Sequence, residues 1–206
     1  MTAQERLVAV AKGETPDKAP TIGLSSASDA MIVLPKNVGA TGRAELGLVM
    51  SPLARAMNRG IDVLKKLSDD PIRGADVLES LENETRLEIA TALKGGAAGV
   101  FYFLDGAYPT TTTPMQYGGH FLELDRRLLQ VFCHAAFNVL YVNGESEPYI
   151  DFVSDLPASG FAWDRDSGIT NQEVRSMRQG ALMGSEFLLE TTARSLEETL
   201  TEKVVC

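Results

Sequence analysis

A short apolar run near the middle of the chain constrains the fold most. Residues 99–104, Gly-Val-Phe-Tyr-Phe-Leu, follow the pair Gly95 and Gly96 and stop at Asp105. A run this short that is apolar on both faces is typical of a strand buried between two layers. The segment 71–94 before it carries apolar residues at helical spacing and ends at the glycine pair. Helix and buried strand form half of an α/β unit, so Asp105 at the carboxyl end of the strand is the first candidate site residue.

Composition and charge limit the class of protein. With 206 residues, 44% of them hydrophobic and 23% charged, the chain suits one globular domain, which we expect to span residues 1–206. The net charge of −9, with acidic and basic residues interspersed, argues against nucleic acid and against a membrane surface as partners. No apolar segment approaches the roughly 20 residues of a membrane span, and the first residues do not resemble a secretory signal. We therefore expect a cytoplasmic protein.

Few residues are available for disulfide or metal chemistry. Cys133 falls in a helix predicted over 115–134 and Cys206 ends the chain, so we expect two free thiols. His120 and His134 fall on the same predicted helix, away from the strand ends where a general base would be needed, and are expected to be structural or solvated. We expect no cofactor and no catalytic metal.

Strands and helices are predicted to alternate along the chain. Strands are predicted at 21–24, 45–50, 99–104, 135–142, 160–163 and 181–184, and helices at 3–12, 53–67, 71–94, 115–134, 147–156 and 171–179. A capping box at 195–198 predicts the start of a last helix, and the run 31–34 is too short to assign. This alternation is the pattern of a parallel sheet with helical crossovers. A (β/α)8 barrel and an open doubly wound sheet both fit, and no G-x-G-x-x-G motif supports a dinucleotide site.

Several segments, taken in order, resemble one known superfamily. They are Glu5-Arg-Leu7, Gly13-Glu14, Asp17-Lys-Ala-Pro20, Pro52-Leu-Ala54, Asp69-Asp-Pro71, the run 96–102, Phe137 to Gly144, Trp163 to Gly168 and 181–184. Their order is similar to that of the uroporphyrinogen decarboxylase superfamily of (β/α)8 barrels, which also contains corrinoid-linked methyltransferases. The last four segments resemble its fourth to seventh strands.

The chain is shorter than that superfamily. Between Leu34 and Glu45 there is no room for a second helix and strand, so the segment with the decarboxylase's catalytic aspartate is missing, as is its arginine-rich substrate loop. The chain also stops at Cys206, before an eighth strand. The expected fold class is therefore α/β, a (β/α)8 TIM-barrel-like fold that is incomplete, with one early β/α unit and the last strand missing. An open parallel sheet exposes backbone edges, so we also expect a homodimer.

The resemblance implies a substrate pocket at the carboxyl ends of the strands. Asp105 is the candidate catalytic residue, with a turn-capping role beside Gly106 as the alternative. The candidate substrate-binding residues are Tyr102, Tyr141, Asn143, Trp163, Asp164 and Arg165. On the fifth strand, where zinc-dependent methyltransferase relatives carry His-x-Cys, this chain has Tyr141 and Asn143, which cannot replace imidazole or thiolate ligands.

Simpler structural roles are open for several of these residues. Asn143 precedes Gly144 in a dipeptide that favours turns. Asp164 and Arg165 can form an exposed ion pair contributing about 0–1 kcal/mol, and Trp163 can belong to the core. The threonines at 110–113 are expected to form only a loop.

The resemblance implies two activities. One is decarboxylation of tetrapyrrole side chains by a uroporphyrinogen decarboxylase-like lyase, as in porphyrin biosynthesis. The other is methyl transfer by a methyltransferase linked to a corrinoid. Either implies a tetrapyrrole- or corrinoid-related small-molecule substrate. The alternative is a non-catalytic protein of the same fold that binds a small molecule or a protein partner.

Overall fold

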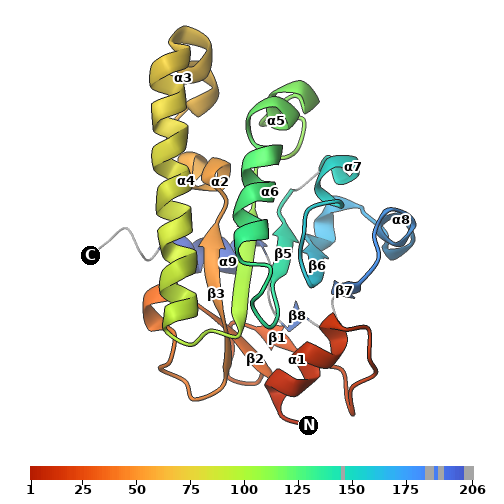
Figure 1. Ribbon diagram of the computed structural model, residues 1–206. Coiled ribbons are helices and arrows are strands. Elements are labelled where there is room, and N and C mark those ends of the chain that lie inside the picture. The colour runs from red at the N-terminus through yellow and green to blue at the C-terminus, as the bar shows by residue number, and fades with distance from the viewer. Residues whose placement is uncertain (145–146, 184–187, 190–192, 202–206) are drawn as a thin grey trace.

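The computed structural model describes residues 1–144, 147–183, 188–189 and 193–201, with the side chains of Arg165, Leu188, Leu189, Ala193 and Thr201 outside that description (Figure 1). Within these ranges the strands form one eight-stranded parallel sheet in the order β7-β6-β5-β4-β3-β2-β1-β8. The strands are β1 Ile22–Gly23, β2 Ala30–Val33, β3 Ala44–Met50, β4 Gly99–Leu104, β5 Val139–Val142, β6 Gly160–Trp163, β7 Ala181–Met183 and β8 Leu188–Leu189.

Helices cover both faces of this sheet. They are α1 Ala3–Ala11, α2 Pro52–Asn58, α3 Val63–Asp69, α4 Pro71–Lys94, α5 Pro114–His120, α6 Leu122–Val131, α7 Ile150–Val153, α8 Asn171–Met177 and α9 Ala193–Thr201, with short 3-10 turns η1 Pro35–Asn37 and η2 Arg165–Ser167. In Figure 1, α4 and α6 lie in front of the sheet and α9 lies behind it. Among the described helices none is long and apolar enough to cross a membrane.

The expected fold class is confirmed: the chain is an incomplete, TIM-barrel-like α/β protein. Two details of the shortening differ from expectation. The unassigned run at 31–34 falls on strand β2, so the strand expected to be missing near the start of the barrel is present. What the chain lacks there is an α-helix before and after β2. A two-residue strand, β8, lies parallel to β1 where the last strand was expected to be missing. In the described ranges nothing pairs β7 with β8, so the barrel stays open there. The homodimer stays a prediction.

Two long predicted helices are each divided in the structure. The segment 53–67 forms α2 and α3, because Gly60 adopts a φ of +66° between them and Asp62 then caps α3 by accepting a hydrogen bond from the Lys65 N–H. The segment 115–134 forms α5 and α6, which meet at Phe121.

Two predicted helix ends also differ. Because α6 ends at Val131, the prediction that Cys133 lies inside a helix is wrong, and its side chain is exposed. The last helix starts at Ala193, not at a capping box on Ser195. Ser195 lies within that helix, where its carbonyl accepts a hydrogen bond from Thr199 Oγ1.

The alternation of side chains along the strands builds two separate cores. On the outer face, Val100 and Leu104 of β4 pack against the helices around the sheet. The inner face is the concave side of the half-barrel. Its buried residues include Leu46, Leu48, Phe101, Phe103, Val139, Tyr141, Ala162 and Met183, and they pack with Leu7 of α1 and with Leu196 and Leu200 of α9. Helices therefore close the inner face at positions far apart in the sequence.

A buried carboxylate organises the loop between β2 and β3 that takes the place of a helix. Glu45, 3% exposed, accepts hydrogen bonds from the N–H of Thr41 at 2.9 Å and from the N–H of Gly39. Burial alone would raise the pKa of Glu45, but these hydrogen bonds and one from the Thr41 hydroxyl outweigh it, so that its pKa lies below the ordinary value. The carboxylate thus accepts hydrogen bonds from loop N–H groups that would otherwise need water as their acceptor.

A second buried carboxyl group lies in the outer core. Asp125 of α6 is 1% exposed and accepts hydrogen bonds from Tyr102 Oη at 2.6 Å and from Tyr117 Oη at 3.0 Å. Burial raises the pKa of Asp125 to about 7, although the two tyrosine hydrogen bonds partly oppose the shift. No lysine, arginine or histidine of the described part forms an ion pair with it, so burial dominates.

The pKa of Asp125 predicts how stability depends on pH. Because its folded pKa of about 7 lies above the ordinary value of 3.8, the group destabilises the fold once the unfolded chain ionises. The free energy of unfolding should fall from pH 4 to pH 7, by at most about 1.4 kcal/mol per unit from this group. Asp125→Asn should remove this part of the slope in urea titrations at several pH values. The control Asp151→Asn, at an exposed position, should keep it, and equal slopes in both variants would contradict the assignment.

Candidate functional site

Asp105 lies on the inner face, directly after β4. It follows Leu104, an outer-face residue, so the alternation points its side chain inward. The N–H of Asn143 donates to the Leu104 carbonyl at 2.8 Å, which brings the carboxyl ends of β4 and β5 together. The Asp105 side chain is 9% exposed. The carboxyl group is therefore buried at the end of the half-barrel where α/β folds place their chemistry.

Three donors surround the Asp105 carboxyl group. The N–H of Gly106 donates to Oδ1 at 2.7 Å, and the side chains of Tyr108 and Asn143 also hydrogen-bond to the carboxyl group. Burial raises the pKa of Asp105 above its ordinary value, and the three hydrogen bonds oppose that rise without cancelling it. Burial thus makes this carboxyl group hold a proton more tightly than a solvated aspartate does, although the donors around it favour the carboxylate. The turn-capping role considered for Asp105 is present as well, through Gly106.

Asn143 connects this carboxyl group to the last helix. Its side chain is 6% exposed, and Nδ2 donates to Glu197 Oε1 of α9 at 3.2 Å. Among the described residues its Oδ1 is buried and has no hydrogen-bond partner. A buried amide oxygen without a donor is costly, so this atom is a ready acceptor for a polar group of a ligand.

Two residues of the site were not predicted from the sequence. Tyr108 is half-buried, and its pKa is raised to about 12 by burial and by the charge of Asp105, so its hydroxyl stays protonated at neutral pH. Its place in the loop directly after β4 is a signal that could have been used. No sequence signal of this kind marks Glu197, because α9 is far from β5 in the sequence and lies beside its end only in the folded chain.

The loop that carries Tyr108 is fixed by buried hydrogen bonds. Thr112 is 2% exposed and its Oγ1 donates to the Gly106 carbonyl at 2.6 Å. The Tyr149 N–H donates to the Ala107 carbonyl at 2.7 Å, and the Tyr149 hydroxyl donates to the Thr112 carbonyl. The threonine segment is a loop, as expected, and it is also anchored to the core.

The backbone after Asp105 requires a glycine. Gly106 has a φ of +88°, and a Cβ atom there would lie 2.6 Å from Leu53 Cδ2. Only glycine meets both conditions without displacing α2. The turn that orients Asp105 therefore depends on this residue.

Tyr141 lies on the inner face, two residues before Asn143. Its ring stacks on Phe103 with centroids 5.8 Å apart and an interplanar angle of 11°, and it also meets Phe101 at 5.6 Å. It is 1% exposed. This predicted substrate-binding residue forms an aromatic floor beneath Asp105 and Asn143.

The structure does not bring Tyr102 and Trp163 to this site. Tyr102 points to the outer face and bonds Asp125. Trp163 packs with the outer core, and its Nε1 donates to the Ile169 carbonyl at 3.1 Å. The alternative that Trp163 belongs to the core matches this placement.

Asp164 lies at the carboxyl end of β6 and is 8% exposed. Its carboxylate accepts a hydrogen bond from the Asp166 N–H at 3.1 Å, which caps η2. A capped turn explains this aspartate without a ligand. The next residue, Arg165, begins η2, and its side chain lies outside the described residues, so its predicted role stays a prediction.

Zinc chemistry of the kind found in the methyltransferases that the sequence resembles does not fit the residues present. The two ligand positions of the fifth strand hold Tyr141, stacked in the aromatic floor, and Asn143, which donates to carboxylates. Across the described residues no group of three His, Cys, Asp or Glu side chains could hold a metal ion. A catalytic zinc site needs three such ligands, and no step through zinc is supported.

Comparison with known proteins identifies a similar fold. No family model and no curated protein sequence matches the chain. Among solved structures, a methyltransferase from Methanosarcina mazei is similar, with a TM-score of 0.73 and 12% sequence identity over 89% of this chain and 82% of that chain. At this identity the similarity shows the fold alone, and it agrees with the incomplete TIM-barrel-like architecture.

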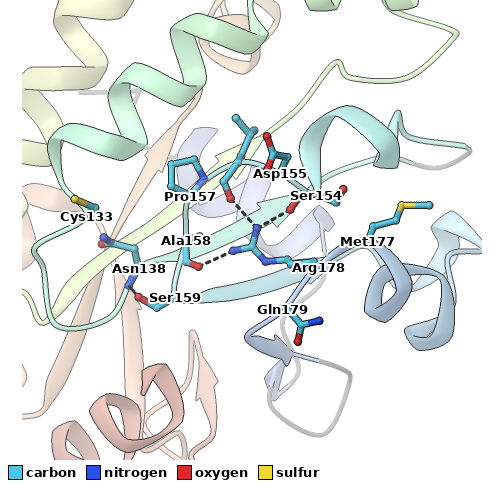
Figure 2. A pocket seen from close by; sticks show the side chains of 11 residues that line it. Cys133, Asn138, Ser154, Asp155, Pro157, Ala158, Ser159, Met177, Arg178 and Gln179 are labelled. Carbon is cyan, nitrogen blue, oxygen red and sulfur yellow. Dashed lines mark hydrogen bonds between the residues drawn. The ribbon is translucent and has the colours of Figure 1, made fainter. Parts of the chain in front are cut away.

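A hollow of about 460 Å³ lies at the opposite, amino ends of β5 and β6. Figure 2 shows its lining, with Arg178 at the centre. The Arg178 guanidinium donates to the carbonyls of Ser154, Leu156 and Ala158 at 2.7, 2.6 and 2.5 Å, and its Cζ lies 5.2 Å from the centroid of the Phe161 ring. Burial lowers the pKa of Arg178. Arg178 fixes the loop between α7 and β6, a role typical of the amino end of a barrel.

The first prediction from these sites concerns Arg178. Arg178→Lys should lower the free energy of unfolding by about 1–3 kcal/mol, because a single ammonium group cannot reach three carbonyls and leaves buried acceptors unpaired. Denaturant unfolding measures the change. Arg73→Lys, at a side chain 86% exposed, is the matched control and should change stability little. Equal effects in the two variants would show that Arg178 does not hold the loop.

The second prediction is that the protein binds no stoichiometric zinc. Protein purified without added metal should contain zinc far below one equivalent by elemental analysis, and a chelator should leave its melting temperature unchanged, because no folding energy depends on metal. Zinc or cobalt that stays near one equivalent after dialysis against a chelator would contradict this prediction. It would show that Tyr141 and Asn143 do not occupy the ligand positions of the metal site.

Proposed function

We propose that the chain binds a small organic substrate at the carboxyl end of the half-barrel and transfers a methyl group from it. The observation that carries the proposal is the buried Asp105 carboxyl group, held by Tyr108 and Asn143 where barrel enzymes bind substrate. The structural similarity to a methyltransferase supports the reaction class. This part of the proposal rests on an analogy of fold.

The chemistry of the lining suggests what the ligand looks like. The stacked rings of Tyr141 and Phe103 are flat and apolar, and at 1% and 2% exposure they would meet a ligand only where it displaces the residues that cover them. Asn143 Oδ1 is open to a donor, and burial raises the pKa of Asp105, which favours the protonated form that can donate a hydrogen bond. A molecule with an apolar face and polar groups at its edge suits this arrangement, and the candidates are tetrapyrrole- and corrinoid-related compounds, which carry polar side chains around a macrocycle.

Asp105 would act as a general acid in this proposal. A nucleophile such as a thiolate, supplied as the second substrate, attacks the methyl carbon while the bond from that carbon to its heteroatom breaks. The bonding electron pair stays on the heteroatom, which takes the proton from Asp105. The resulting carboxylate is then stabilised by the donors of Gly106, Tyr108 and Asn143.

Two other functions are weighed against methyl transfer. A decarboxylase-like lyase could use the same proton, and it would need a cationic side chain to hold substrate carboxylates, the role that would fall to the predicted residue Arg165. Non-catalytic ligand binding is favoured by a specific observation. Helix α9 lies at the end of β5, and its Glu197 accepts a hydrogen bond from Asn143, so a side chain of the protein itself occupies a polar group of the candidate site. The assay below separates these outcomes.

Asp105→Asn should lower the rate of methyl transfer by about 10²–10⁴-fold, the range typical of a lost general acid. Methyl donors with a deuterated methyl group, mixed with a thiol acceptor, allow product to be followed by mass spectrometry. The wild-type rate should fall as pH rises, because Asp105 loses its proton, and the exposed control Asp151→Asn should match the wild type.

The outcomes distinguish the three functions. Loss of carboxylate from added uroporphyrinogen, without methyl transfer, would replace the proposal by the lyase. Binding of a tetrapyrrole or corrinoid by calorimetry, without turnover of any substrate, would leave only the binding protein. Methyl transfer that Asp105→Asn does not slow would remove Asp105 from the reaction.

A further inference from the structure

Helix α9 lies against the inner face of the sheet, where a substrate would enter. Leu196 and Leu200, one turn apart, are 0% and 2% exposed and pack with the inner-face residues. Arg194 and Glu198 form an exposed ion pair on the other side of the helix. The helix is therefore amphipathic, and its apolar side is what closes the half-barrel.

The same helix covers the Asp105 site. Glu197 lies between the two leucines in the sequence, and its carboxylate accepts a hydrogen bond from Asn143 Nδ2 at 3.2 Å. The charge of Glu197 also contributes to raising the pKa of Tyr108. Both contacts reach the side chains that hydrogen-bond to Asp105. A ligand that touches Asp105 and Asn143 would thus occupy space that α9 now fills.

The attachment of α9 suits a part that can leave. Its nine residues are too few for a helix to be stable alone in water. Within the described ranges, no backbone hydrogen bond joins residues 193–201 to the sheet or to another helix. Contacts of side chains hold the helix in place, whereas β3 to β6 are joined by backbone ladders. Elements held in this way open locally at lower free energy than the whole fold.

We propose that α9 is a displaceable cover over the Asp105 site, which closes the inner face in the free protein and gives way to a ligand. This proposal rests on the proposed function only for the identity of the ligand that enters the site. Its opening and closing is a property of the free protein and can be measured without substrate.

Labelling by a water-soluble carbodiimide with an amine tests this directly, because the reagent modifies protonated carboxyl groups that it can reach. Leu200→Glu places a charge at a buried position and should release α9. We expect Asp105 to be labelled about tenfold faster in Leu200→Glu than in the wild type, the factor for a modest change in a local opening equilibrium. Peptide mass spectrometry gives the rate at each carboxyl group.

Matched controls keep the test specific. Leu87→Glu makes the same substitution at a leucine of α4 that is 68% exposed, and should leave labelling of Asp105 at the wild-type rate. Asp125, buried in the outer core, should label slowly in every variant and so reports that the rest of the fold is intact. If Asp125 becomes reactive in Leu200→Glu, the milder Leu200→Ala decides, with a smaller acceleration at Asp105 alone.

Two results would overturn the cover. One is labelling of Asp105 in the wild type as fast as at the exposed Asp151. The other is unchanged labelling of Asp105 while hydrogen exchange shows that α9 has melted in the variant. Absence of methyl transfer by the wild type, or a rate that Asp105→Asn does not lower, would not affect either measurement, so the two proposals can fail separately.

Discussion

Burial of β4 on both faces is the constraint on which the rest of the structure depends. Its outer side chains meet the long helix α4 and the buried Asp125, and its inner rings form the aromatic floor. A strand covered on both sides has no exposed face along which its register can slip, so its end is placed accurately. Asp105 takes its position from that end, and Gly106 then turns the chain toward Tyr108.

Much of this arrangement could be predicted from the sequence, because the central elements carry strong local signals. The all-apolar run of β4 and the helix that ends at Gly95 fix one α/β unit, and the turn after β5 places Asn143 beside Asp105. The short strands were harder to predict. β1, β2 and β8 hold two to four residues each, and pairing with neighbours rather than their own pattern makes them strands.

The site was predicted less completely, for reasons that are also physical. Tyr102 and Trp163 lie next to inward-pointing residues in the sequence, and the alternation along a strand sends them to the outer face. Glu197 comes to Asn143 across more than fifty residues, through packing of Leu196 and Leu200 that no local pattern encodes. A sequence reveals which residues can bear chemistry, and the tertiary fold decides which of them meet.

The pairing of β1 with β8 has a consequence for the order in which the protein is assembled. It joins Ile22 to Leu188, so strand β1 can pair with β8 only after residues far later in the chain have been synthesised. Contacts of such long sequence separation form slowly, because the intervening chain must lose its freedom before the contact is gained. Until they form, the aromatic inner face of β4 and β5 stays open to water during synthesis on the ribosome. Newly made chains should then bind chaperones through this face, until β8 and α9 have emerged to close it.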